Sequence, residues 1–350
     1  MIVQVERTVL NDDRWHPLLD VVVAVLSQAG SRHAFDTRQY EQLLRSPWLS
    51  NATGVRATTP EFLRSSAKAV SREGTSDAVT IRIDDAGPIY GESLAGGVIR
   101  IHPFGALTIL LQPLHVVVED ESSDGAFLLW MARILGRDAI RRAYSAGRLV
   151  FRHAGGKTQM VKSARSLSYG VWARPAQPIL SMKLRIIAIL DSDARFPGDQ
   201  PNVEIAREVE PYVAFVRILN ARAIENYVPY PYARRRLQKD NLAGAADSFF
   251  KLTESQRDHF PLKRGFRDAA ALPQSHASFM ADNSRHVSER GHFASVSAVE
   301  WIQYAGGFGD RLGDVYREAE FRCSATDGQL LTKSQRAELN EFLTQVITYL

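Results

Sequence analysis

Two aspartates separated by one serine end a nearly unbroken apolar run in the stretch ILDSDARFPGD, residues 189–199. Carboxylates are rarely buried, and two that lie close together repel each other, so Asp191 and Asp193 need water, hydrogen bonds or a cation as compensation. A divalent metal ion is one such partner. A turn is the alternative, because Asp and Ser are common where a strand passes into a loop. These residues alone leave both interpretations open.

A second group of acids lies in LHVVVEDESSDGAFLLWMARILG, residues 114–136. Four of the six residues from Glu119 to Asp124 are acidic. In parallel sheets, ligands bind in the crevice at the carboxyl ends of the strands. Both acidic groups follow apolar strand-like runs, so we expect them to face one crevice. The dipole of a helix also favours acids in its first turn, which explains Asp120 and Glu121 better than Glu119, the residue that ends the strand.

Carboxylate oxygens in such a crevice suit Mg²⁺ or Mn²⁺, which bind a few carboxylates and leave positions free for water and phosphate oxygens. The expected chemistry is therefore phosphoryl transfer or phosphodiester hydrolysis, in which a metal ion can activate water and stabilise the departing oxygen.

Composition sets wide limits. The chain has 350 residues, 45% of them apolar, and a formal net charge of +4, which permits nucleic-acid binding without requiring it. Cys323 is the single cysteine, so the chain can form neither an internal disulfide nor a cysteine-based zinc cage. The longest apolar runs are too short to cross a bilayer, and we expect a soluble, cytoplasmic protein without membrane contact.

The hydrophobic pattern changes twice along the sequence and predicts three regions. Residues 1–112 mix helical patterns, including one at residues 60–72, with β-like runs such as AVTIRI, GGVIRIHP and ALTILL, and predict an α+β region of unknown role. Residues 113–270 alternate strands and helices, which predicts an α/β domain. Residues 271–350 predict a mainly helical extension, with helices at 298–305 and 332–349.

In the middle region, LHVVV (114–118), RLVF (148–151) and KLRIIAIL (183–190) read as strands. Such continuous apolar strands are typical of a parallel sheet covered by helices on both faces. Between the first two lies a helix from about residue 124 to 135, which Ser123 can cap and Gly136 can end.

These features together resemble the TOPRIM domain, a parallel-sheet metal-binding module of topoisomerases, bacterial primases and several nucleases. The similarity lies in an acid that closes a strand (Glu119), a following Asp124, and a later strand that ends in Asp-x-Asp (Asp191, Asp193). RILNARAIENYVP (217–229) and HFPLKRGF (259–266) further resemble the I-E-N-Y and Lys-x-Gly segments of the overcoming-lysogenisation-defect nucleases and related phage-defence proteins. The resemblance covers about residues 112–270.

The resemblance implies a role for each matching residue. Glu119, Asp124, Asp191 and Asp193 would bind Mg²⁺ or Mn²⁺, although the usual Glu-Gly-x-x-Asp is here Glu-Asp-Glu-Ser-Ser-Asp. Glu225 would join the metal shell or hold the site together, and is otherwise an ordinary helix-surface acid. Lys263 would be the cation near the scissile phosphate, and is otherwise a solvated surface lysine.

Two further stretches are rich in basic residues or glycine. NYVPYPYARRRLQK interleaves tyrosines with arginines, a combination suited to binding nucleic acid; the candidates are Tyr230, Tyr232, Arg234, Arg235 and Arg236. A proline-rich turn that leads into a basic helix is the alternative. HAGGKTQ lacks the first glycine of a P-loop, so it predicts a loop in which Lys157 is at most an auxiliary phosphate contact.

The expected function is that of a divalent-metal-dependent endonuclease, with DNA as the first substrate. By the resemblance, it acts in bacterial anti-phage defence with a separate ATPase subunit, and homo-oligomers are compatible with this role. Two alternatives stay open: an effector that cleaves RNA, including transfer RNA, and a nonenzymatic partner subunit with a degenerate TOPRIM fold.

Overall fold

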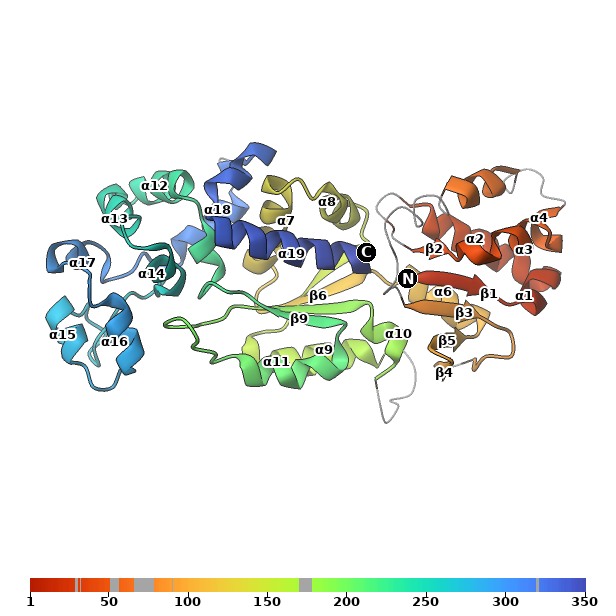
Figure 1. Ribbon diagram of the computed structural model, residues 1–350, viewed down its shortest axis with the longest axis horizontal. Coiled ribbons are helices and arrows are strands. Elements are labelled where there is room, and N and C mark those ends of the chain that lie inside the picture. Colours follow the sequence, from red (N-terminus) through yellow and green to blue (C-terminus); the bar gives the residue numbers. More distant parts are fainter. Residues whose placement is uncertain are drawn as a thin grey trace.

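The computed structural model describes residues 1–28, 31, 33–50, 57–65, 79–89, 91–169, 178–318 and 321–350. The molecule is elongated, and its two sheets follow one another along the long axis, with a group of short helices beyond the second sheet (Figure 1). Within the described residues, no helix combines the length and the apolar character that a bilayer crossing requires.

The amino-terminal sheet has the strand order β2-β1-β3-β5-β4. Its strands are β1 (Ile2–Val5), β2 (Ala34–Phe35), β3 (Thr80–Ile83), β4 (Ser93–Ala95) and β5 (Val98–Ile101). β1 pairs in parallel with β2 and β3, β3 pairs in parallel with β5, and β4 runs antiparallel to β5. The region predicted as α+β is therefore a parallel-dominated α/β arrangement: helices lie between β1 and β2 and between β2 and β3, whereas β3, β4 and β5 follow one another without a helix in the part of the chain that the structure describes.

One apolar run of this region was assigned to the wrong element. ALTILL lies in the helix α6 (Pro103–Leu111), which packs against α2 (His16–Leu26). Pro103 stands at the first turn of α6, where its fixed φ favours a helix, and the His102 ring accepts a hydrogen bond from the backbone nitrogen of Phe104. A short apolar run does not by itself distinguish a buried helix from a strand. Of the helix predicted at residues 60–72, residues 60–65 are helical, and 66–72 lie outside the described residues.

The central sheet is parallel throughout, with the order β7-β6-β8-β9. Its strands are β6 (Leu114–Val118), β7 (Leu149–His153), β8 (Ile186–Leu190) and β9 (Phe215–Ile218). The first three overlap the predicted strands, but β8 begins only at Ile186, because Lys183 belongs to the helix α10 (Leu180–Lys183). The strand β9 is additional. The predicted parallel sheet is thus confirmed, and the region has an α/β architecture.

Helices cover both faces of the central sheet, as Figure 1 shows. Val117 and Ala188 belong to one hydrophobic cluster with residues of α9 (Met160–Ser168) and α11 (Val203–Val209). Val116 and Ile187 belong to the cluster that includes α7 (Ser123–Ile134) and α19 (Lys333–Tyr349). Successive side chains of β6 and β8 therefore both find an apolar partner, which is why these strands read as continuous apolar runs.

The helix α7 begins one residue earlier than predicted. Ser122 occupies the cap position without a side-chain capping bond, and Ser123, predicted as the cap, is already the first helical residue. Gly136 follows the last turn with a φ of +66°, as the sequence predicts for a helix end.

The carboxyl-terminal part of the chain contributes to two places. Its last helix, α19, packs on the central sheet. Its shorter helices surround an aromatic cluster in which the Phe266 ring stacks on Trp301 at 4.7 Å. These helices are α14 (Glu254–His259), α15 (His276–Ala281), α16 (Val287–Phe293) and α17 (Ala298–Tyr304). The other helices, in various parts of the molecule, are α1 (Arg7–Asn11), α3 (Tyr40–Leu44), α4 (Pro47–Ser50), α8 (Asp138–Ser145), α10 (Leu180–Lys183), α12 (Tyr230–Gln238), α13 (Ala243–Phe249) and α18 (Asp314–Arg317).

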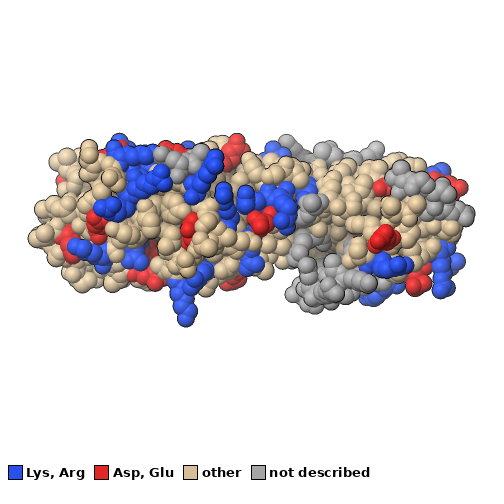
Figure 2. Space-filling model, turned by 90° about the horizontal axis from the view of Figure 1, so that it is seen from above, with Lys and Arg blue, Asp and Glu red and all other residues tan. Residues whose placement is uncertain are grey.

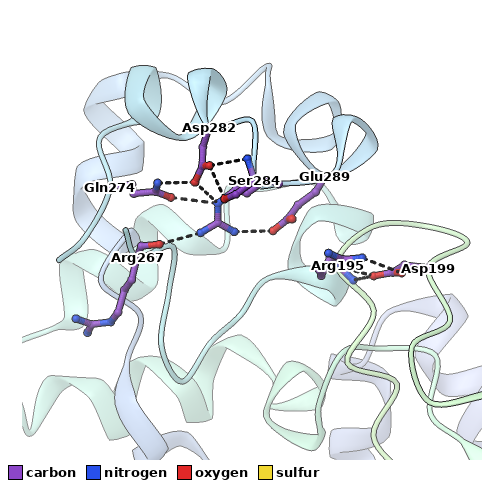
Figure 3. A network of polar contacts seen from close by, with 8 residues as sticks. Arg195, Asp199, Arg267, Gln274, Asp282, Ser284 and Glu289 are labelled. Carbon is purple, nitrogen blue, oxygen red and sulfur yellow. Dashed lines mark hydrogen bonds and ion pairs between the residues drawn. The ribbon is translucent and has the colours of Figure 1, made fainter. Parts of the chain in front are cut away.

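One arginine ties the loops of this helical group together. Arg285 donates hydrogen bonds to Oε1 of Gln274 at 3.1 Å, to Oε1 of Glu289 at 2.9 Å and to the backbone oxygen of Arg267 at 3.1 Å. Figure 3 shows these groups converging, with Asp282 beside them. The polar network holds α16 against the loop that precedes α15.

Candidate functional site

A pocket of about 500 Å³ lies at the carboxyl ends of β6 and β8. Separate segments of the chain supply its charged lining: Glu119, Asp120, Asp124, Lys157, Asp191, Asp193, Arg222, Glu225, Lys263 and Arg264. The structure thus brings together all six residues that the sequence singled out as catalytic or metal-binding, namely Glu119, Asp124, Asp191, Asp193, Glu225 and Lys263. We call this pocket the acidic pocket.

The loop after β8 is folded tightly around its two aspartates. Oδ1 of Asp191 accepts a hydrogen bond from the backbone nitrogen of Ile224 at 3.1 Å. Asp193 has a φ of +53°, in the left-handed region that few non-glycine residues adopt. The side-chain amide of Asn202 donates to the backbone oxygen of Asp191 at 2.7 Å and to Oδ2 of Asp193 at 3.1 Å. Such backbone strain is maintained where the surrounding contacts fix it, and it occurs often at functional sites.

The same loop is braced against the carboxyl-terminal helical group. The Phe196 ring stacks on His286 with centroids 4.8 Å apart. Nε of Arg195 donates to Oδ2 of Asp199 at 2.8 Å, and Figure 3 shows this pair close to Glu289. The position of the two aspartates therefore depends on helices that follow more than eighty residues later in the sequence.

Lys157 enters the acidic pocket from the turn after β7. Gly155 and Gly156 reverse the chain there with φ angles of +79° and +105°, which glycine adopts readily. The Lys157 ammonium group then contacts Oδ2 of Asp193 and lies 3.8 Å from Oε2 of Glu119. This lysine, expected at most as an auxiliary contact, therefore joins the ends of β6 and β8.

Glu225 lies at the bottom of the acidic pocket in the short 3₁₀ helix η6 (Ile224–Tyr227). It is 3% exposed, and its Oε1 pairs with Nζ of Lys263 at 3.2 Å. Its other oxygen, Oε2, is buried and has no hydrogen-bond partner among the described residues. A buried carboxylate oxygen without a partner is costly, so this atom is available to a ligand.

The backbone explains the glycine two residues after Lys263. Gly265 has a φ of +64°, and a Cβ atom placed there would lie 2.1 Å from the backbone oxygen of Ala305 and 2.3 Å from the backbone nitrogen of Gly307. The two chain segments can approach this closely only because residue 265 has no side chain. Their contact fixes the turn that presents Lys263.

Burial and neighbouring carboxylates raise the pKa values of Asp191 and Asp124. Burial raises the pKa of Asp191 well above its usual range, and the charges of Asp124 and Glu225 raise it further. Burial likewise raises the pKa of Asp124 to about 6, and Glu119 and Asp120 add to the effect. Like charges are thus crowded in this pocket beyond what the surrounding solvent relieves.

The acidic pocket has the ligand chemistry that a divalent cation requires, but its side chains are not arranged around an ion. All its anionic groups offer carboxylate oxygens, the ligands that Mg²⁺ and Mn²⁺ prefer, and Oε2 of Glu225 lacks a partner. However, among the described residues no group of three or more His, Cys, Asp or Glu side chains is arranged to hold an ion as the side chains stand. The ammonium group of Lys157 takes that place beside Glu119 and Asp193.

Asp120 has a local structural role. Its carboxylate accepts hydrogen bonds from the backbone nitrogen and the hydroxyl of Ser122, both at 2.9 Å, and from the hydroxyl of Ser123 at 3.2 Å. It therefore closes the turn that begins α7, in agreement with the helix-start interpretation.

The residues predicted to bind nucleic acid lie on α12, outside the acidic pocket. Arg236 is 8% exposed and pairs with Asp240 at 2.9 Å and Asp314 at 3.0 Å, so its charge serves the interior. The Tyr232 hydroxyl donates to Asp327 at 2.7 Å, which likewise commits that side chain to an internal contact.

The other three α12 candidates are exposed. The Tyr230 hydroxyl and Nε of Arg234 both donate to Oδ1 of Asp247, at 2.8 and 2.9 Å, while the Arg235 guanidinium lies over the Phe321 ring. Figure 2 shows Lys and Arg side chains gathered on the face that α12 and α8 help to form.

Comparison of the chain with protein-family models, with curated proteins and with solved structures finds no match.

The structure adds pocket residues that the sequence did not single out. Arg222 and Arg264 line the acidic pocket beside Lys263. Their signal is weak in the sequence, because isolated arginines are common on surfaces. The sequence does indicate a pocket position for Lys157. Two glycines and this lysine follow a strand of the same parallel sheet, and the turns that follow parallel strands lie at the same edge of the sheet.

Proposed function

We propose that the protein is a metal-dependent endonuclease that hydrolyses phosphodiester bonds in nucleic acid, with DNA as the first substrate to test. One observation supports this above all. Carboxylates from the ends of two parallel strands, a buried glutamate with an unpartnered oxygen, and cationic side chains meet in one pocket at the ligand-binding edge of the sheet. The expected TOPRIM relationship belongs to the same proposal.

In this proposal the anionic and cationic residues have different tasks. Glu119, Asp124, Asp191 and Asp193 would hold Mg²⁺ or Mn²⁺, and Glu225 would join the metal shell or hold the site together. The metal supplies an activated water and charge neutralisation at the phosphate. Lys263 and Arg264 lie beside the carboxylates and are placed to bind phosphate oxygens, which a guanidinium can contact in a bidentate manner.

The test compares cleavage by the wild type with that by Glu119→Gln and Asp191→Asn. Each purified protein is incubated with supercoiled plasmid and with RNA in Mg²⁺ or Mn²⁺. We expect the wild type to cleave and both variants to lose activity by at least about a hundredfold, because each change removes an anionic metal ligand while keeping the shape of the side chain.

Glu121→Gln is the matched control. Glu121 lies two residues from Glu119, is exposed, and does not line the acidic pocket, so this variant should cleave as the wild type does. Activity that survives in Asp191→Asn, or that is lost equally in Glu121→Gln, contradicts the assignment of the site.

A second candidate function is that of a nonenzymatic partner subunit, and the contact of Lys157 with Asp193 and Glu119 favours it. If this lysine permanently replaces a cation, the acidic pocket serves assembly alone. Isothermal titration calorimetry with Mn²⁺ separates the two functions. Binding that disappears in Asp191→Asn supports the enzyme, while a wild type that binds no divalent ion supports the subunit.

Three further properties rest on the resemblance alone: the ATPase partner, the role in anti-phage defence, and homo-oligomer formation. Activity that appears only after a separate ATPase is added would identify a gated effector.

A further inference from the structure

A second charged pocket lies at the opposite end of the central sheet, next to the amino-terminal sheet. It has a volume of about 180 Å³. Its polar and charged lining consists of Gln28, Ser31, His33, Gln112, Arg148 and Arg185. Arg148 directly precedes β7, and Arg185 directly precedes β8. We call it the basic pocket.

Arg185 is a buried cation without an acidic partner. It is 2% exposed, and its guanidinium donates to two backbone oxygens, that of Gln112 at 3.1 Å and that of Tyr349. Among the described residues it forms no ion pair. Burial, together with the nearby Arg148, lowers the pKa of Arg185 to about 10. Neutral carbonyl groups thus compensate this charge in part.

Arg148 leaves hydrogen-bond donors unused in the same place. Its Nε and Nη2 atoms are buried, and among the described residues they have no hydrogen-bond partner and the side chain forms no ion pair. Unpartnered guanidinium nitrogens are costly to bury, and two adjacent guanidinium groups repel each other. The His33 ring, 4% exposed, lies beside the two guanidinium groups. Two cations therefore face this cavity with unused donors. Among the described residues no acidic side chain lines it, and Leu350, the last residue of the sequence, also belongs to its lining.

We propose that the basic pocket binds a phosphate group. An oxyanion would satisfy the free donors of Arg148 and relieve its repulsion with Arg185, and guanidinium groups match phosphate geometry. Size limits the ligand. At about 180 Å³ the cavity is below the roughly 300 Å³ at which drug-sized ligand sites begin, and a group of the size of one phosphate suits it. The ligand is therefore free phosphate or the terminal phosphate of a larger molecule.

The test measures phosphate binding in the presence of EDTA, so that no metal in the acidic pocket can contribute to the binding. Calorimetry with inorganic phosphate is carried out at constant ionic strength on the wild type, Arg148→Met and Arg142→Met. Arg142 is an exposed arginine on α8 that does not line the basic pocket, and it controls for the loss of one positive charge.

We expect saturable binding to the wild type and to Arg142→Met, and binding at least about tenfold weaker to Arg148→Met, since a charge-assisted hydrogen bond is lost. Thermal unfolding gives a second measurement: phosphate should raise the melting temperature of the wild type and not that of Arg148→Met. Wild type that binds no phosphate, or equal binding by Arg148→Met, overturns the proposal.

Two nucleic-acid ligands distinguish the source of the phosphate. A short oligonucleotide with a 5′-phosphate should compete with inorganic phosphate if the pocket takes terminal phosphates, whereas the same oligonucleotide with a 5′-hydroxyl should not. If neither competes while inorganic phosphate still binds, free phosphate is the ligand. These measurements need no cleavage activity, so their failure would leave the endonuclease proposal untouched.

Discussion

Replacing Lys157 tests whether a lysine now fills the place of a cation in the acidic pocket. Lys157→Met keeps the length of the side chain and removes its charge. The Lys157 side chain is 19% exposed, and its ammonium group contacts Asp193 and lies 3.8 Å from Glu119. Without it, the cationic lining residues that remain in the pocket are Arg222, Lys263 and Arg264, of which Lys263 pairs with Glu225.

The size of the effect follows from distance and exposure. Two unit charges 4 Å apart interact by about 4 kcal/mol at the effective dielectric near a protein surface. The side chains of Asp193 and Glu119 are 43% and 45% exposed, so solvent screens most of this energy, and fully exposed pairs contribute about 1 kcal/mol or less. In EDTA we expect Lys157→Met to lose about 1–2 kcal/mol of unfolding free energy.

Divalent cations should reverse this loss. In the wild type a cation must displace the lysine, but in Lys157→Met it enters carboxylates that have no competing ammonium group. We therefore expect Mn²⁺ to bind the variant about tenfold more tightly, which corresponds to about 1.4 kcal/mol. A ligand present at a hundredfold excess over its dissociation constant stabilises the folded state by about 2.7 kcal/mol, so the difference is measurable.

The assay is urea unfolding of wild type, Lys157→Met and Lys162→Met, with EDTA and with saturating Mn²⁺. Lys162 is an exposed lysine on α9 outside the acidic pocket and should behave as the wild type does. The reasoning is refuted if Lys157→Met is as stable as the wild type in EDTA, or if Mn²⁺ stabilises the two proteins equally.

Two further predictions concern stability away from the metal ligands. Gly265→Ala should cost at least about 2 kcal/mol in urea unfolding, since its Cβ would meet the backbone oxygen of Ala305 at 2.1 Å, whereas Gly244→Ala, in an open part of α13, should be neutral or stabilising by up to about 1 kcal/mol; equal effects would contradict the close approach. The second prediction is a pH dependence. Burial, together with Arg152 and Arg185, lowers the pKa of His115 to about 4, and its Nδ1 accepts from Nε of Arg152 at 3.1 Å. The histidine of the unfolded chain binds its proton at higher pH than that of the folded protein. The folded protein therefore keeps its full unfolding free energy above about pH 6.5 and loses at most roughly 3 kcal/mol of it as the pH falls toward 4. Unfolding curves of His115→Gln should lack this part of the pH dependence, and parallel curves for the two proteins would exclude it.

The strands β6 and β8 of the central sheet could be predicted because they are apolar and buried on both faces, whereas the residues of the unpredicted β9 are only half-buried. β6 and β8 each lie between two helical layers, so neither strand shows the alternation that would suggest one exposed face, and the acids begin only where each strand ends. The helix α6 could not be predicted with the same rule, since its apolar run is as short as a strand. Burial dictates apolar residues in both cases, and the backbone conformation is decided by the residues around them.

The candidate site was predicted where the acids themselves carry the signal, and less well where long-range contacts decide. The sequence around Lys157 lacks the first glycine of a P-loop and therefore suggests only an auxiliary contact. Its position in the acidic pocket follows instead from the pairing of β7 with β6. Arg236 reads as part of a basic helix, but the fold buries it against Asp240 and Asp314. Exposure of a charged side chain depends on tertiary partners, which local sequence does not reveal.

The last helix shows how far the acidic pocket extends along the chain. Glu338 of α19 accepts hydrogen bonds from the backbone nitrogen of Asn220 at 2.8 Å and from the Tyr227 hydroxyl at 2.7 Å. Gln335 of the same helix donates to the backbone oxygen of Asn226 at 3.2 Å. These contacts hold both ends of the short segment that carries Glu225. Because this glutamate is buried and one of its oxygens has no partner, its position must be imposed by the backbone, and α19 supplies part of that constraint. The I-E-N-Y segment therefore acts with a helix more than a hundred residues away, beyond the part of the chain in which the resemblance is found.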